Sequence, residues 1–144
     1  GRIEMIKIVY WSGTGNTENM ANNIAEGIKV SGKEVHTAHV GEVNAAEVMR
    51  AELIVLGCPA MGAEQLEEDE MQPFVDALLL EVQGKKVALF GSYGWGSGEW
   101  MDSWKEEMKA AGANVICEPL IVNEFTVGQD EEICKQYGEA LAKL

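Results

Sequence analysis

A segment rich in hydroxyl and glycine residues near the start of the chain has the composition of an anion-binding loop. Its members are Ser12, Gly13, Thr14, Gly15, Asn16 and Thr17. It follows a mostly apolar run and precedes apolar residues at helical spacing. Unpaired N–H groups at the start of a helix, together with the helix dipole, favour a negative ligand. We therefore predict that a phosphate-bearing ligand binds here, with the side chains as additional donors.

This first loop matches neither of two common nucleotide-binding motifs. A Walker P-loop ends in Gly-Lys followed by Ser or Thr, but residues 12–17 contain no lysine. The motif G-x-G-x-x-G matches at Gly13 and Gly15, but Glu18 stands where the third glycine belongs. A cradle without a cation suits a monophosphate held by hydrogen bonds. The alternative interpretation is a turn that only caps a helix.

A second loop has residues that can hold a flat ring. Its members are Pro59, Ala60, Met61, Gly62, Ala63 and Glu64. Met61 offers a polarisable apolar surface, and Glu64 can accept a hydrogen bond from a ring N–H. Gly62 allows its peptide unit two orientations, because φ of either sign costs glycine little. The alternative is an ordinary turn with a solvated Glu64.

A third loop places a large aromatic residue between glycines. Its members are Ser92, Tyr93, Gly94, Trp95 and Gly96. Trp95 is a candidate stacking platform, and the glycine N–H groups beside it can donate to a ring carbonyl or nitrogen. The alternative is a tryptophan that folds back onto the core.

Together the three loops describe a mononucleotide with an aromatic head group. A phosphate would lie at residues 12–17 and a planar heterocycle between Met61 and Trp95. Adenine rarely needs apolar surfaces on both faces together with an acidic partner for an N–H. A flavin fits better because it carries an N3–H and a redox-active N5, so FMN is the predicted cofactor.

Alternating strands and helices would bring these loops together. Strands are expected at residues 5–11, 34–40, 53–58, 86–91 and 114–122, and helices at residues 15–31, 44–50, 66–80 and 130–144, with a further helix through Trp100, Trp104 and Met108 that ends at Gly112. Pro73 marks either a restart of its helix or a position in the first turn. Strict alternation predicts an α/β fold with a parallel sheet covered on both faces. In such sheets ligands bind beyond the carboxyl ends of the strands, where all three loops lie.

The length and composition fit one domain over residues 1–144. The chain has a mass of 15.7 kDa, with 47% hydrophobic and 24% charged residues. Residues 1–4 precede a plausible start at Met5 and are interpreted as a cloning remnant. No apolar run approaches the roughly 20 residues of a membrane span, so a cytoplasmic protein is expected.

The charge balance is strongly acidic, with 24 acidic against 11 basic residues and a net charge of −13. This argues against binding to nucleic acid or to anionic membranes. An acidic protein is steered toward basic patches on other proteins. The candidate docking surface consists of Glu64, Glu67, Glu68, Asp69 and Glu70. The alternative is that these acids gather at the start of a helix because of its dipole.

The cysteines and histidines give no sign of a metal site. Cys58, Cys117 and Cys134 are odd in number and far apart, which favours buried free thiols over disulfides, zinc or iron–sulfur chemistry. His36 and His39 are three apart on an expected strand, so their side chains face opposite sides.

Three pieces of the sequence resemble short-chain flavodoxins of anaerobic bacteria. They are Tyr-Trp-Ser-Gly-Thr-Gly-Asn-Thr at residues 10–17, Gly-Cys-Pro-Ala-Met-Gly at residues 57–62 and Leu-Phe-Gly-Ser-Tyr-Gly-Trp-Gly at residues 89–96. The resemblance spans essentially the whole chain from Met5, in matching order and spacing. It implies a flavodoxin-like three-layer α-β-α sandwich with a five-stranded parallel sheet in the order 2-1-3-4-5.

The resemblance also implies how FMN would be held. Its phosphate would bind residues 12–17, and Met61 and Trp95 would lie on opposite faces of the isoalloxazine ring. Glu64 would lie near N3, and Gly94 near N1 and O2.

One residue departs from the pattern of the resembling family. The resemblance implies that the Gly62 carbonyl turns toward N5–H on one-electron reduction and stabilises the neutral semiquinone. Ala63 stands where relatives often carry glycine or a small polar residue. If the reduced loop requires positive φ there, alanine costs about 1 kcal/mol more than glycine.

The implied function is electron transfer without substrate chemistry, so no catalytic residue is assigned. The protein would be a low-potential one-electron carrier with non-covalently bound FMN, cycling mainly between semiquinone and hydroquinone. A net charge of −13 disfavours a reduced anionic flavin, which lowers the potential. A cytoplasmic monomer is expected, with redox partner proteins that carry basic docking patches.

Two other functions fit the sequence less well. An FMN-dependent NAD(P)H:quinone-type reductase on the same fold needs a substrate pocket above the flavin, yet Trp95 would cover one ring face. A phosphoacceptor receiver needs an aspartate at the end of the third strand, where Cys58 and Pro59 stand.

Overall fold

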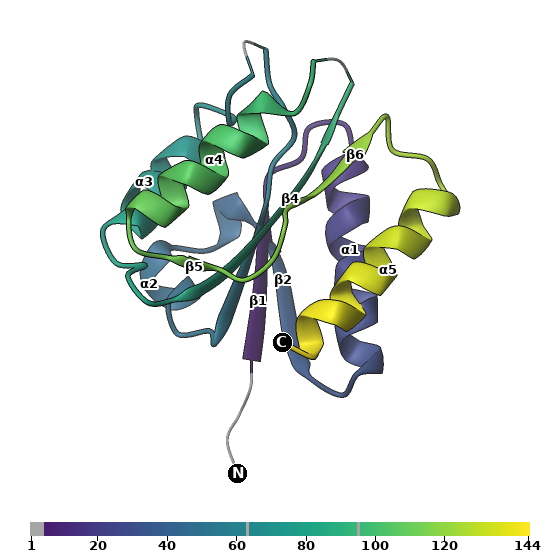
Figure 1. The fold of residues 1–144 in the computed structure, drawn as a ribbon, viewed down its shortest axis with the longest axis horizontal. Coiled ribbons are helices and arrows are strands. Elements are labelled where there is room, and N and C mark those ends of the chain that lie inside the picture. The colour runs from purple at the N-terminus through teal and green to yellow at the C-terminus, as the bar shows by residue number, and fades with distance from the viewer. Residues whose placement is uncertain (1–4, 63, 95) are drawn as a thin grey trace.

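Strands and helices alternate along the chain in the computed structural model, which describes residues 5–62, 64–94 and 96–144 (Figure 1). The strands are β1 (Met5–Tyr10), β2 (Glu34–His39), β3 (Leu53–Gly57), β4 (Lys86–Tyr93), β5 (Asn114–Val115) and β6 (Leu120–Asn123). The helices are α1 (Asn16–Val30), α2 (Ala45–Val48), α3 (Met71–Leu79), α4 (Glu99–Ala110) and α5 (Gln129–Ala142), with a 3-10 turn η1 (Val40–Glu42).

The strands form one parallel sheet in the order β2-β1-β3-β4-β5, with β6 also paired to β4. The predicted order 2-1-3-4-5 is confirmed. Tyr10 lies beside Gly57, and Gly57 beside Phe90. The carboxyl ends of β1 and β3 therefore meet at one edge of the sheet, alongside the last part of β4.

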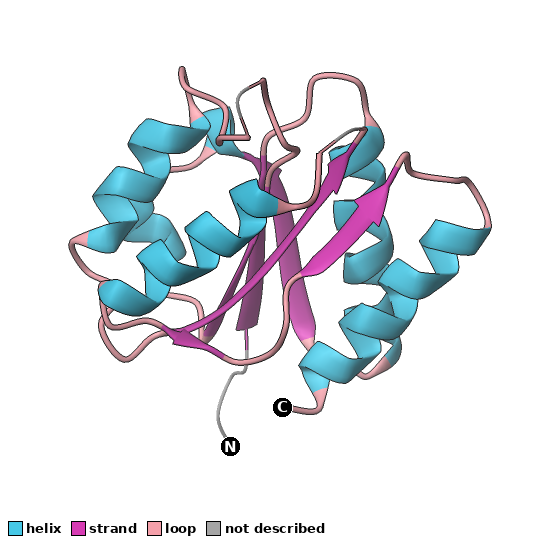
Figure 2. Ribbon diagram, turned by 45° about the horizontal axis from the view of Figure 1, so that its top comes forward, coloured by secondary structure: helices cyan, strands magenta, loops and turns pink. Residues whose placement is uncertain are grey.

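Helices cover both faces of the sheet, as Figures 1 and 2 show. Alternate strand residues point to opposite faces. Ile8, Val55 and Phe90 belong to a core cluster with residues of α1 and α5, whereas Ile54 and Leu89 pack with the helices of the other face. The result is the expected three-layer sandwich with two hydrophobic cores.

The start of α3 differs from the expectation. The helix begins at Met71, not at Leu66, and Pro73 lies in its first turn, where proline is tolerated. The Glu67 carboxylate accepts hydrogen bonds from the backbone N–H groups of Asp69, Glu70 and Met71 at 2.9, 2.8 and 2.9 Å. This side chain holds the preceding residues in a turn, and the expected helix start was wrong for that reason.

The expected strand at residues 114–122 is also not continuous. It divides into β5 and β6, with residues 116–119 between them. Pro119 lies in the break, and proline has no N–H to donate to a ladder. The expectation of five strands holds when β5 and β6 are taken as halves of one broken strand.

Candidate cofactor site

A cavity of about 480 Å³ opens at the carboxyl edge of the sheet. Its lining comes from four separate segments: Trp11, Ser12, Gly13, Thr14, Asn16 and Thr17; Pro59, Ala60 and Met61; Ser92, Tyr93 and Gly94; and Glu124 and Phe125. The volume lies within the roughly 300–1,000 Å³ of small-molecule sites. The three loops singled out from the sequence therefore border one space.

The first loop brings the start of α1 to this cavity. Gly15 precedes the helix with a φ of 99°, a left-handed conformation that favours glycine, and its N–H donates to Ser12 Oγ at 3.1 Å. No side chain in the described part of the chain caps α1. The N–H groups of the first turn therefore stay available to an anionic ligand at the positive end of the helix dipole.

Two buried hydroxyls join the first loop to the third. Thr17 is 1% and Ser92 5% exposed, and their hydroxyl oxygens lie 3.3 Å apart. Both residues line the cavity. A hydroxyl can donate and accept, so this pair can turn a proton toward a phosphate oxygen while keeping its mutual contact.

The second loop is tied to the third by the backbone. The N–H of Ala60 donates to Ser92 O, and the N–H of Met61 to Gln65 O, both at 3.0 Å. The indole N–H of Trp100 donates to Cys58 O at 3.1 Å, so α4 also fixes the end of β3. These bonds present the Met61 side chain at the cavity on a well-supported turn.

Glu64 makes a hydrogen bond that the sequence did not suggest. Its carboxylate accepts a hydrogen bond from the backbone N–H of Trp100 at 2.9 Å and so caps the start of α4. Its φ of 53° is left-handed, which is uncommon outside glycine. Glu64 does not border the cavity, and neither do Gly15, Gly62 and Gly96.

Two of the predicted site residues, Ala63 and Trp95, lie outside the described residues. Their assignments rest on the sequence pattern alone.

Three lining residues were not among the predicted site residues. Trp11 precedes the first loop, and its ring lies 2.9 Å from where a Cβ on Gly13 would stand, so a larger residue there would have to displace the ring. Glu124 and Phe125 follow β6. The place of Glu124 and Phe125 could have been predicted from the topology, because the fifth strand of a parallel sheet ends at the same edge as the others.

The acidic cluster divides into a buried and an exposed part. Glu67 is 7% exposed, whereas Glu68, Asp69 and Glu70 are exposed. Burial raises the pKa of the Glu67 carboxyl, but three backbone hydrogen bonds outweigh it and hold the pKa below its ordinary value. Glu67 is therefore a cap of α3 and not part of a docking surface.

The cysteines are all free. Cys58 and Cys134 are fully buried, and burial raises the pKa of each thiol to about 12. Cys117 is only half-buried, so the expectation of buried thiols holds for two of the three. The described residues contain no group of three His, Cys, Asp or Glu side chains that could hold a metal ion.

The described part of the chain also has no helix of the length and apolar character needed to cross a membrane.

The fold and the cavity define a doubly wound α/β protein with a cavity where the strand order reverses between β1 and β3, the place where such sheets bind ligands. A family model described as Flavodoxin matches residues 8–137. The flavodoxin of Megasphaera elsdenii is 51% identical over 139 residues, which cover 96% of this chain and 99% of the relative. That of Clostridium beijerinckii is 49% identical over 139 residues, covering 96% and 100%. The solution structure of two-electron reduced Megasphaera elsdenii flavodoxin matches with a TM-score of 0.88, over 97% of this chain and 100% of that one.

The chain belongs to the flavodoxin family. Flavodoxins bind FMN and carry electrons between redox partner proteins. The chain is accordingly an FMN-binding electron-transfer protein and not an enzyme, and the reductase alternative is not supported.

Proposed function

We propose that FMN binds in the cavity at the carboxyl edge of the sheet, with its phosphate against residues 12–17. The observation that carries this proposal is the convergence of three separately predicted loops on one 480 Å³ space. The cavity has hydroxyls and helix N–H groups at one part of its lining and the side chains of Met61, Tyr93 and Phe125 at others. A ligand with a phosphate and a flat apolar ring matches that chemistry.

The phosphate would be held by neutral donors. The start of α1 offers backbone N–H groups, and the hydroxyls of Ser12, Thr14 and Thr17 can join them. The buried Ser92 hydroxyl adds a donor from β4. Because the loop has no lysine, such a phosphate-binding site would retain the cofactor through many hydrogen bonds.

The ring would be bordered by the second and third loops. We assign one ring face to Met61, which lines the cavity. The assignments of Trp95 to the other face and of Glu64 to a ring N–H come from the sequence resemblance. Glu64 would have to leave its hydrogen bond to Trp100 to reach the ring, so its assignment is the most readily tested of the three.

Bound FMN supplies the redox-active ring that accepts and releases single electrons. The residues of this chain hold the cofactor, exclude water from part of it and set its electrostatic surroundings. A net charge of −13 opposes the addition of negative charge to the ring, which favours a low potential.

We further propose that the exposed acids Glu68, Asp69 and Glu70 meet basic patches on redox partners. Electron-transfer encounters need only small, transient contact areas, and charge complementarity speeds them. The chain would act as a monomer in the cytoplasm. Three free thiols suit a reducing compartment.

Electron delivery to a basic acceptor tests this function. The purified protein loaded with FMN is reduced with dithionite under nitrogen and mixed with cytochrome c, a basic one-electron acceptor. We expect stoichiometric reduction of cytochrome c, at a rate that falls as ionic strength rises. No transfer would contradict the function, and steady NADH-dependent turnover of a quinone would favour the reductase instead.

A further inference from the structure

We propose that Tyr137 on α5 is a positioning residue for the cavity wall formed by Glu124 and Phe125. The inference rests on the proposed function, since this wall would border the cofactor. Neither Tyr137 nor its partners line the cavity. Tyr137 acts on the wall indirectly: it contacts the break between β5 and β6, and β6 leads from that break to the wall.

The outer strand has more residues in the break than β4 has alongside it. Val115 pairs with Val87 and Leu120 with Phe90. Between these two pairs β4 advances by three residues and the outer strand by five, so two residues of the outer strand are extra. Such a bulge leaves the register of the following strand open, and a slip of one residue would turn every side chain of β6 to the opposite face.

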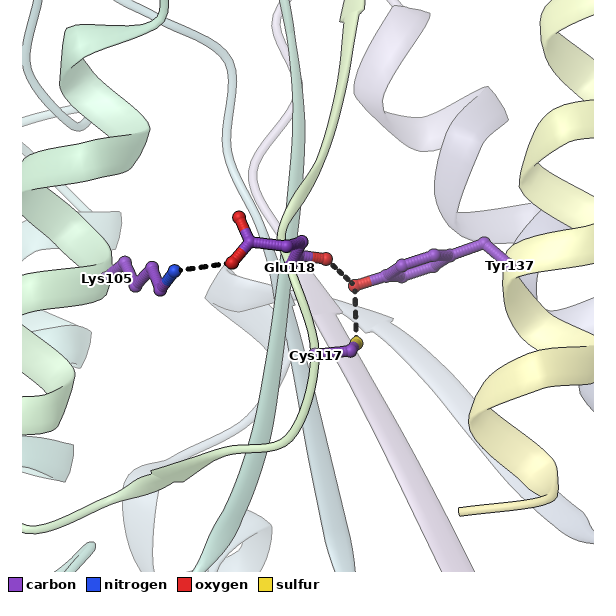
Figure 3. A network of polar contacts seen from close by, with 4 residues as sticks. All are labelled: Lys105, Cys117, Glu118 and Tyr137. Carbon is purple, nitrogen blue, oxygen red and sulfur yellow. Dashed lines mark hydrogen bonds and ion pairs between the residues drawn. The ribbon is translucent and has the colours of Figure 1, made fainter.

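The Tyr137 hydroxyl contacts the bulge at Cys117 and Glu118 (Figure 3), and it also lies against β4. Its oxygen lies 3.3 Å from Leu89 O on β4, 3.2 Å from Glu118 O in the bulge and 3.4 Å from the thiol of Cys117. One hydroxyl thus contacts both strands at the point where their register changes. Burial and the contact with Cys117 raise the pKa of Tyr137, so the phenol keeps the proton that it donates.

A second contact reaches the bulge from the other side. Lys105 Nζ on α4 lies 2.8 Å from Glu118 Oε1, and Figure 3 shows Lys105 and Tyr137 approaching Glu118 from opposite directions. The side chains of Lys105 and Glu118 are 23% and 86% exposed. An ion pair with one largely exposed partner contributes little, so the hydroxyl is the main anchor of the two.

The strand beyond the anchor leads directly to the cavity. β6 runs from Leu120 to Asn123, and the N–H of the next residue, Glu124, donates to Tyr93 O at 2.8 Å. Phe125 and Tyr137 both pack against the core cluster of α1 and α5. A short strand held at both ends keeps the wall in one place, whereas loss of the Tyr137 anchor frees β6 to shift along β4.

Tyr137→Phe tests the inference, because it removes the hydroxyl and keeps the ring. One hydrogen bond of ordinary strength corresponds to about a three- to tenfold change in an equilibrium. We expect the Kd for FMN to rise by about that factor. We also expect the Glu124 amide to exchange with solvent faster by about that factor in the full chain without added FMN, while the Asn19 amide on α1 keeps its rate.

Two control variants separate positioning from general weakening. Cys134→Ala removes a buried side chain from the same helix, and Lys105→Met removes only the exposed ion pair. We expect both to leave the Kd for FMN and the Glu124 exchange near the unsubstituted values when the proteins are fully folded. Unchanged Glu124 exchange in Tyr137→Phe, or an equal effect of Cys134→Ala, would overturn the inference. Failure of the unsubstituted chain to bind FMN would overturn the proposed function instead, because amide exchange reports the wall without cofactor.

Discussion

At the scale of single residues, the site combines side chains from four strand ends, and one of these side chains is charged. Glu124 lines the cavity in a left-handed conformation with a φ of 50°. Residues held in sparsely populated conformations cluster at functional sites. The hydrogen bond from its N–H to Tyr93 O offsets part of the free-energy cost of that conformation. It also joins the segment after β6 to the third loop.

Glu124→Gln should therefore raise the midpoint potential of bound FMN. Removing one negative charge beside a ring that gains charge on reduction is worth roughly 20–50 mV at the distances of a cavity wall. The matched control is Glu52→Gln, which makes the same charge change at an exposed residue whose N–H donates to Met5 O, at the opposite edge of the sheet. Potentiometric titration gives both values, and equal shifts would show that only net charge matters.

The site residues divide sharply in how well the sequence reveals them. Ser12, Thr17, Met61 and Ser92 lie in glycine-rich or turn-forming segments at strand ends, and the cavity includes all four. Phe125 has no glycine neighbour, so only its place after the last strand, and not the local composition, points to it. The hydrogen bond from Trp100 to Glu64 depends on the path of a turn that local sequence does not determine.

At the scale of secondary-structure elements, local capping decides where α3 begins. Apolar spacing extends back to Leu66, and glutamate is a good helix former, so periodicity favours an earlier start. The buried Glu67 carboxylate instead accepts hydrogen bonds from three backbone N–H groups, the last of them that of Met71, where the helix begins. A side chain that bonds its own backbone competes with the helix, and no pattern of apolar residues records that competition.

Glu67→Gln should destabilise the protein by about 1–2 kcal/mol at pH 7, because glutamine keeps only one of the two acceptor oxygens of this cap and loses the negative charge. The folded-state pKa of Glu67 is depressed, so its contribution is present above the unfolded pKa and is lost as pH falls through the folded pKa. The difference from the unsubstituted protein should shrink as pH falls below about 4. Urea unfolding across pH measures it, and a constant difference would contradict the assigned role.

The packing of α1 against α5 depends on two glycines. A Cβ on Gly27 would lie 2.0 Å from Lys135 O, and one on Gly138 would lie 2.1 Å from Ile24 O. The two helices therefore approach closely, and α1 is the helix whose start is the proposed phosphate-binding site.

Gly27→Ala should cost about 1–3 kcal/mol of stability through overpacking, although alanine is the better helix former by about 1 kcal/mol. Asn22→Ala, at an exposed position of the same helix, should change stability by less than about 0.5 kcal/mol. Urea unfolding distinguishes them. Equal stability of Gly27→Ala and the unsubstituted protein would show that the helices can move apart freely.

At the scale of the whole molecule, alternation of apolar strands and amphipathic helices determines the topology. Leu53–Gly57 is buried throughout, as expected of a central parallel strand. The sheet order and the edge that holds the cavity follow from that pattern. The break at Pro119 is the exception, although proline within an expected strand is itself a warning.

The central claim is that the start of α1 binds the phosphate of FMN, and comparison of FMN with riboflavin tests it most directly. Both flavins carry the same ring, and riboflavin lacks only the phosphate. Titration of the FMN-free protein, followed by quenching of flavin fluorescence, gives both affinities. We predict one FMN per chain and riboflavin binding weaker by a factor of about 100 or more, since several hydrogen bonds to a charged group are lost. Equal affinity for the two flavins, or no quenching by FMN, would contradict the claim.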